Sequence, residues 1–92
     1  MERRVIERAV RIVNSLGLHA RPAAQLVRLA SSFGCEVELV KDGVPVNSKS
    51  IMGVMMLAAE CGSQLIVRTT GTDAEAAAVA MAELIESGFG ET

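Results

Sequence analysis

The 92-residue sequence has no tryptophan or tyrosine, and its only phenylalanines are Phe33 and Phe89. A hydrophobic core must therefore be built from aliphatic side chains, which are plentiful because half of the residues are hydrophobic. Basic residues interleaved with aromatic ones, the pattern typical of nucleic-acid binding, are missing. The formal net charge of −2 points the same way. We expect no nucleic-acid partner.

Long apolar runs are also absent. Charged residues such as Glu60 and Arg68 interrupt every candidate before it reaches the roughly 18 residues of a membrane span. Residues 1–4 are rich in arginine, but Glu7 and Arg8 follow and no apolar signal segment develops. We expect a cytoplasmic protein without membrane insertion, folded as a single domain over residues 1–92.

Metal-binding residues are few. The chain has one histidine and two cysteines, Cys35 and Cys61, which form no CxxC pair. We therefore expect no metal site and no cofactor. Reduced, at least partly buried thiols are the expected state, with a disulfide as the alternative.

Hydrophobic periodicity predicts four strands and three helices. The strands are expected over residues 7–13, 35–40, 44–47 and 64–70, with Asp42-Gly43 as the turn of a hairpin. The helices are expected over residues 20–32, ending near a left-handed Gly34, over residues 51–57, and from a Thr72–Glu75 capping box to Gly88. The fold class is α+β in the order βαββαβα. Two long helices and one short helix accompany a four-stranded antiparallel sheet in an open-faced sandwich.

The single histidine lies where a glycine-containing loop meets a helix. Residues 17–24 read Gly-Leu-His-Ala-Arg-Pro-Ala-Ala. Pro22 suits a first helical turn, where free amides and the helix dipole attract anions. Arg21 adds a guanidinium that matches phosphate oxygens, and the imidazole of His19 is a nucleophile. This arrangement can carry a phosphoryl group, although a cap or a solvated surface group is the commoner role of a lone histidine near a helix end.

Two motifs together resemble the HPr family, the histidine phosphocarriers of the bacterial phosphotransferase system. The first is residues 17–24, and the second is residues 49–55, Lys-Ser-Ile-Met-Gly-Val-Met. They stand at the family's relative spacing, and the resemblance extends from about residue 7 to residue 88. It implies that His19 accepts a phosphoryl group from phosphorylated enzyme I and passes it to an enzyme II A domain. Arg21 would then neutralise the transferring charge, and the chain would be a carrier, not an enzyme.

The second motif contains Ser50, which the residues alone assign as the N-cap of the short helix. The resemblance implies a second role, regulatory phosphorylation by an HPr kinase/phosphorylase. The apolar residues after Ser50 are too dense to be wholly buried, so we expect one or two in the core and the others in a docking surface. The residues expected at partner interfaces are Leu16, Ala20, Arg28, Ile51, Met52 and Met55.

Three other functions remain as alternatives. A carrier of the nitrogen-related phosphotransferase branch fits the ending at residues 84–89. A purely regulatory HPr-like binding module is disfavoured by the presence of His19. A small-molecule-binding regulatory domain is the third alternative, but no glycine-rich pocket motif in the sequence supports it. The chain is expected to be a monomer.

Overall fold

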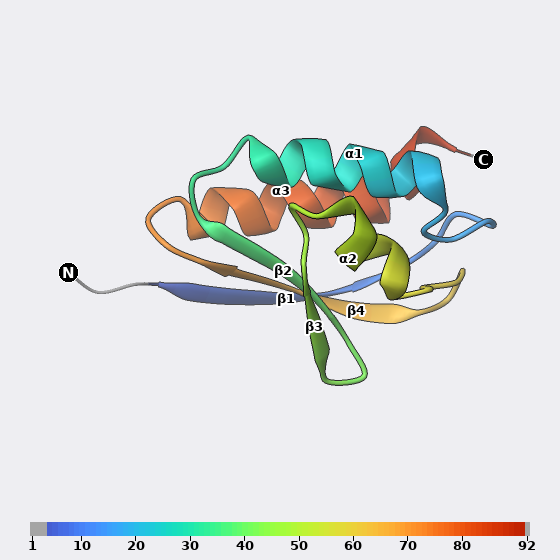
Figure 1. The fold of residues 1–92 in the computed structure, drawn as a ribbon, viewed down its shortest axis with the longest axis horizontal. Helices are drawn as coiled ribbons and strands as arrows, with labels where there is room; N and C mark the ends of the chain where they lie inside the picture. The colour runs from blue at the N-terminus through green and yellow to red at the C-terminus, as the bar shows by residue number, and fades with distance from the viewer. Residues whose placement is uncertain (1–3, 92) are drawn as a thin grey trace.

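The computed structural model describes residues 4–91, so most of the arginine-rich start of the chain lies outside the described residues. The elements follow the predicted order (Figure 1). They are β1 (Val5–Arg11), α1 (Ala20–Ser31), β2 (Glu36–Lys41), β3 (Val44–Asn47), α2 (Ile51–Met56), β4 (Gln64–Thr70), α3 (Ala74–Glu86) and the short 3-10 turn η1 (Gly88–Gly90). All strand pairs are antiparallel, and the strand order is β1-β4-β2-β3. The predicted open-faced α+β sandwich is confirmed.

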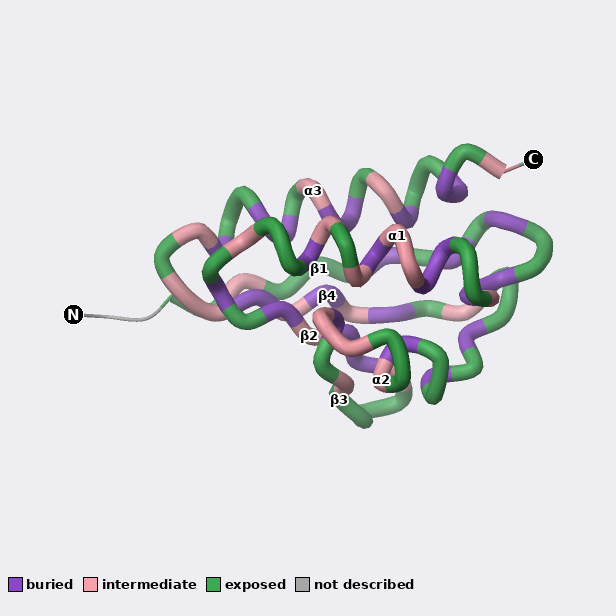
Figure 2. Tube along the Cα trace, turned by 45° about the horizontal axis from the view of Figure 1, so that its top comes forward, coloured by how far each residue is buried: buried purple, intermediate pink, exposed green. Residues whose placement is uncertain are grey.

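The two long helices lie side by side over one face of the sheet (Figure 1). Buried and partly buried residues alternate along β4, and one stripe of each long helix is buried against the sheet (Figure 2). The core is aliphatic, as the composition requires, and Phe89 is its one buried aromatic side chain among the described residues. The largest fully buried apolar side chains belong to Ile12, Leu26, Leu39, Leu65, Met81 and Ile85.

The opposite face of the sheet carries charged side chains. Glu7 on β1 and Glu38 on β2 both pair in register with Arg68 on β4, the strand that lies between them. The Arg68 guanidinium donates to Glu7 at 2.8 Å and to Glu38 at 3.4 Å. Such cross-strand pairs keep this face solvated, so the core lies on the helical side only.

Two predicted helix-end features, the left-handed Gly34 after α1 and the Thr72 N-cap of α3, are wrong for a shared reason, whereas α1 itself ends within one residue of the predicted end. Gly34 does not adopt a left-handed conformation, and the N-cap of α3 is Asp73 instead of Thr72. The Asp73 carboxylate accepts hydrogen bonds from the backbone amides of Gly34 and Cys35, both at 2.9 Å. This contact between two loops satisfies the chain after α1, so no glycine cap is needed there.

The hairpin turn agrees with the sequence prediction, whereas the burial of the cysteines agrees only in part. Asp42 and Gly43 both have positive φ, at 51° and 80°, as a tight hairpin turn requires. Cys35 is buried but Cys61 is exposed, so the expected burial of both thiols is wrong for Cys61. Within residues 4–91, no helix combines the length and apolarity needed to cross a bilayer.

Candidate functional site

His19 is the N-cap of α1. Its backbone is extended, with φ −78° and ψ −173°, and its carbonyl accepts the first helical hydrogen bond from Ala23 at 3.0 Å. The preceding Leu18 is buried, which anchors the loop, whereas the His19 side chain remains 35% exposed. The ring is therefore held in place but open to an approaching molecule.

The loop before His19 packs closely against the turn that follows α2. The Leu18 amide donates to the carbonyl of Ala59 at 2.9 Å. Gly17 has a φ of +66°, and a β-carbon there would lie only 2.5 Å from the Ala59 oxygen. Only glycine fits this position, because both the left-handed backbone and the contact exclude a side chain.

The first turn of α1 offers unpaired donors beside the ring. Within residues 4–91, the amides of Ala20 and Arg21 have no hydrogen-bond acceptor, and Pro22 has no amide hydrogen. The Arg21 side chain is exposed and makes no hydrogen bond or ion pair in the same range. Free amides, the positive end of the helix dipole and a free guanidinium together suit an anion.

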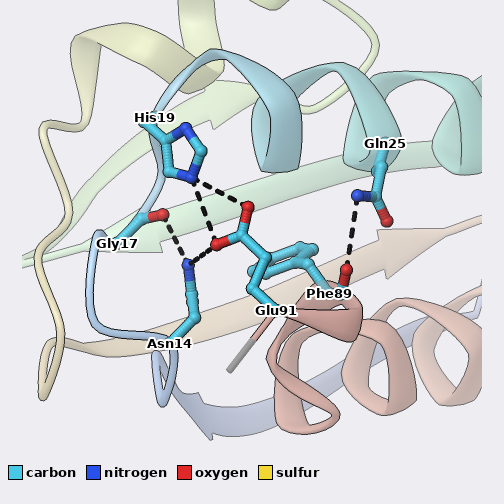
Figure 3. A network of polar contacts seen from close by, with 6 residues as sticks. All are labelled: Asn14, Gly17, His19, Gln25, Phe89 and Glu91. Carbon is cyan, nitrogen blue, oxygen red and sulfur yellow. Dashed lines mark hydrogen bonds and ion pairs between the residues drawn. The ribbon is translucent and has the colours of Figure 1, made fainter.

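Glu91 contacts the other side of the ring (Figure 3). Its two carboxylate oxygens lie 2.9 Å and 3.1 Å from His19 Nε2. Figure 3 shows the second ring nitrogen, Nδ1, on the opposite edge of the imidazole, away from Glu91. The hydrogen bond to His19 is the main cause that lowers the pKa of Glu91. Burial opposes this lowering, while a hydrogen bond from Asn14 and the electrostatic effects of His19 and Arg21 add to it.

Asn14 joins this network from the loop after β1. Its amide Nδ2 donates to the Gly17 carbonyl at 2.8 Å and to Glu91 Oε1 at 3.0 Å. Neither Asn14 nor Glu91 was expected from the sequence. They are 77 positions apart, and no local pattern relates a loop asparagine to a glutamate beyond the last helix.

Comparison with known proteins identifies the family. The profile described as "PTS HPr component phosphorylation site" matches residues 6–87. The "Phosphocarrier protein HPr" of Treponema pallidum is 46% identical over 87 residues, covering 95% of this chain and 99% of that protein. The crystal structure of HPr-C-His from Thermoanaerobacter tengcongensis has a TM-score of 0.90 at 45% identity, covering 95% of this chain and 98% of the other.

This chain belongs to the HPr family. The recognition made from the two motifs is therefore confirmed, and the family is one of phosphocarriers. Two other relatives have different names. The "HPr-like protein Crh" of Halalkalibacterium halodurans is 43% identical over 82 residues, covering 89% of this chain and 98% of that protein. The "Phosphocarrier protein NPr" of Shewanella violacea is 38% identical over 86 residues, covering 94% of each chain.

The second HPr motif forms α2, which packs beside α1 at the end of the molecule where α1 begins (Figures 1 and 2). Ser50 is its N-cap, and the Ser50 hydroxyl oxygen accepts a hydrogen bond from the Gly53 amide at 3.2 Å. The structural role expected from the sequence is therefore confirmed. Ser50 is half-buried.

The apolar side chains of α2 form an exposed surface, which we call the α2 patch: Ile51, Met52, Met55 and Met56. Met52 and Met56 are 70% and 77% exposed. The expectation that one or two of the four are buried is wrong, because α2 buries Val54 and then Leu57 instead. The other expected interface residues Leu16, Ala20 and Arg28 are exposed. Arg28 lies eight residues after Ala20 and thus about 12 Å further along α1.

Proposed function

We propose that this chain is a phosphocarrier that receives a phosphoryl group on Nδ1 of His19 from phosphorylated enzyme I and delivers it to an enzyme II A domain. One observation carries the proposal. The His19 ring is about one-third exposed at the start of α1, with Nε2 bound to Glu91 and Nδ1 without a hydrogen-bond partner within residues 4–91.

The first turn of α1 supplies what phosphoryl transfer needs from a carrier. Transfer depends on in-line positioning and on neutralising the charge of the equatorial oxygens. The amides of Ala20 and Arg21 and the exposed Arg21 guanidinium can meet those oxygens as the group arrives. The chain is then the intermediate of the transfer and needs no metal or nucleotide of its own. An open site holds the phosphate loosely, as onward transfer requires.

The α2 patch is the surface on which we expect enzyme I and the enzyme II A domain to dock. Methionine side chains adapt to different partners, and an exposed apolar group next to a reactive residue is typical of an interaction site. The exposed residues Leu16 and Ala20, which flank His19 in the sequence, and Arg28 further along α1 are the other residues that we expect to contact these partners. We propose that the chain acts as a monomer, because each partner must reach the same face.

Intact-mass spectrometry tests the carrier function. Incubation with phosphoenolpyruvate and enzyme I should add one phosphate that is lost in mild acid, and His19→Ala should gain none. Arg21→Ala should fold normally but accept phosphate about 100-fold more slowly, the usual loss when one charge-stabilising donor is removed. Arg8→Ala, which removes an exposed arginine on β1, is the control. An acid-labile phosphate on the His19→Ala variant contradicts the assignment of His19. Equal rates of phosphate uptake by the parent, Arg21→Ala and Arg8→Ala contradict the assignment of Arg21.

We further propose that Ser50 is a regulatory phosphorylation site for an HPr kinase/phosphorylase. A phosphate there would add nearly two negative charges beside the α2 patch. It would repel a phosphorylated partner while remaining compatible with the start of a helix. Incubation with ATP and such a kinase should give an acid-stable phosphate that is absent from Ser50→Ala. A phosphate that persists in Ser50→Ala places the modification elsewhere.

The sugar-uptake branch of the phosphotransferase system is our first assignment. The 46% identity to the HPr of Treponema pallidum, against 38% to the NPr of Shewanella violacea, supports it. The nitrogen-related branch is the alternative, favoured by the ending at residues 84–89. A competition assay with the two kinds of acceptor domain distinguishes the two branches. Transfer from the phosphorylated chain to a sugar-specific enzyme II A domain should outpace transfer to a nitrogen-related one, and the reverse order overturns the assignment.

A further inference from the structure

The end of the chain forms a hook that returns to His19. Gly88, Phe89 and Gly90 all have positive φ, at 72°, 59° and 75°. A left-handed backbone is unfavourable for phenylalanine, but the buried Phe89 ring holds the turn in place. Gln25 on α1 also donates to the Phe89 carbonyl, at 3.4 Å. The hook directs Glu91 toward the start of α1 (Figure 3).

The contact between Glu91 and His19 determines which ring nitrogen is protonated. An ionised carboxylate can only accept hydrogen bonds, and both of its oxygens face Nε2. The Nε2 atom must therefore carry the hydrogen. In the neutral ring this leaves the lone pair on Nδ1.

Asn14 keeps the carboxylate in this position. It is a buried residue, and the two donors of its side-chain amide are divided between the Gly17 carbonyl and Glu91 Oε1. The Glu91 side chain is only 19% exposed, so solvent screens the contact weakly. The carboxylate is thus fixed to the loop that carries His19 as well as to the ring.

We infer that Glu91 is a positioning residue that selects Nδ1 of His19 as the phosphoryl acceptor and offsets the positive charge of the phosphorylated ring. The inference rests on the proposed function. In the step, the Nδ1 lone pair forms the new bond to phosphorus. The bond from phosphorus to the donor atom of enzyme I breaks, and its electron pair leaves with that atom. The proton stays on Nε2, so the ring becomes a cation that faces the Glu91 carboxylate.

Nitrogen-15 NMR of the histidine ring tests the selection without any phosphate. At a pH where the ring is neutral, the parent should carry its hydrogen on Nε2. Glu91→Ala should shift the ring nitrogens toward a mixture of the two neutral forms. Glu86→Gln removes an exposed carboxylate from the end of α3 and should leave the ring unchanged. A parent ring with its hydrogen on Nδ1, or identical ring spectra for the parent and Glu91→Ala, overturns the inference.

Phosphoryl transfer from enzyme I provides the second readout. Glu91→Ala should accept phosphate on the order of 10-fold more slowly, by analogy with the loss seen when the group that orients a metal-bound histidine is removed. Glu91→Gln keeps an acceptor but not the charge, and should fall between Glu91→Ala and the parent. A Glu91→Ala rate equal to that of the parent overturns the inference. If no protein accepts phosphate, the proposed function fails, while the ring spectra still decide the role of Glu91.

Discussion

At the scale of single residues, the two thiols have opposite surroundings. Burial, together with the neighbouring Asp73 carboxylate, raises the pKa of Cys35 to about 11, whereas Cys61 is exposed. Because the thiolate is the reactive form, we expect an alkylating reagent at pH 8 to modify Cys61 rapidly and Cys35 only on unfolding. Mass spectrometry of the labelled chain should find one fast site, absent from Cys61→Ser and kept in Cys35→Ser. Two sites that react at equal rates contradict this.

Asp73 is a second residue whose surroundings have a measurable consequence. Its pKa is lowered, first by a hydrogen bond with the Cys35 side chain and then by the Gly34 amide. A lowered folded-state pKa contributes stability above the unfolded value of 3.8, and this contribution is lost as the pH falls through the folded value. Asp73→Asn should therefore be less stable than the parent at pH 7, with a difference that shrinks below about pH 4.

Urea denaturation over a pH series measures this difference in the free energy of unfolding. Asp42→Asn, which changes an exposed carboxylate in the hairpin turn, should show no such pH-dependent difference. A constant difference between Asp73→Asn and the parent from pH 7 to pH 3 contradicts the assigned cause.

Residues of the site divide sharply into those that local sequence can identify and those that it cannot. His19, Arg21 and Pro22 were found because loop, cap and first turn are contiguous. Asn14 and Glu91 were missed because their contact closes only after the sheet, the helices and the η1 hook have formed. Local rules describe a helix end well, but they do not place a distant carboxylate against it.

At the scale of elements, α2 depends on its N-cap. It has only six residues and no acidic side chain in its first turn. Loss of the Ser50 hydroxyl, which accepts from the Gly53 amide, should cost about 1 kcal/mol of unfolding free energy in Ser50→Ala. Urea denaturation measures the loss. Ser31→Ala, at an exposed position near the end of α1, should show no loss of stability. Equal stability of Ser50→Ala and the parent would mean that the N-cap does not stabilise α2.

The helices and strands were predicted well along their lengths and less well at their ends. The strand over residues 64–70 was located correctly because a run rich in β-branched residues follows the turn-forming sequence Cys61-Gly62-Ser63. The first strand begins and ends two residues earlier than expected, since pairing with β4 covers Val5–Arg11. The start of α3 was misplaced because the Asp73 carboxylate binds the backbone amides of Gly34 and Cys35 in another loop. The sequence around Asp73 does not reveal such a distant contact.

At the scale of the whole molecule, stability rests on a small aliphatic core. Leu26 is fully buried on α1, the helix that begins beside His19. Leu26→Ala should lower the free energy of unfolding by about 2–5 kcal/mol, a large part of the roughly 5–15 kcal/mol typical of a domain. Thermal and urea denaturation measure the loss. Leu16→Ala makes the same change at a side chain that is 73% exposed and should leave stability nearly unchanged. Equal losses of unfolding free energy in Leu26→Ala and Leu16→Ala would contradict the assignment of Leu26 to the core and of Leu16 to the surface.

The close fit of Gly17 against Ala59 has a practical consequence for observing the molecule at work. Only two positions beyond Ala59, the exposed Cys61 has its sulfur 3.8 Å from the Val13 carbonyl in the loop that leads to His19. A fluorophore attached to that thiol would lie against both segments. The fold thus provides a natural attachment point for an optical sensor of events at the ring.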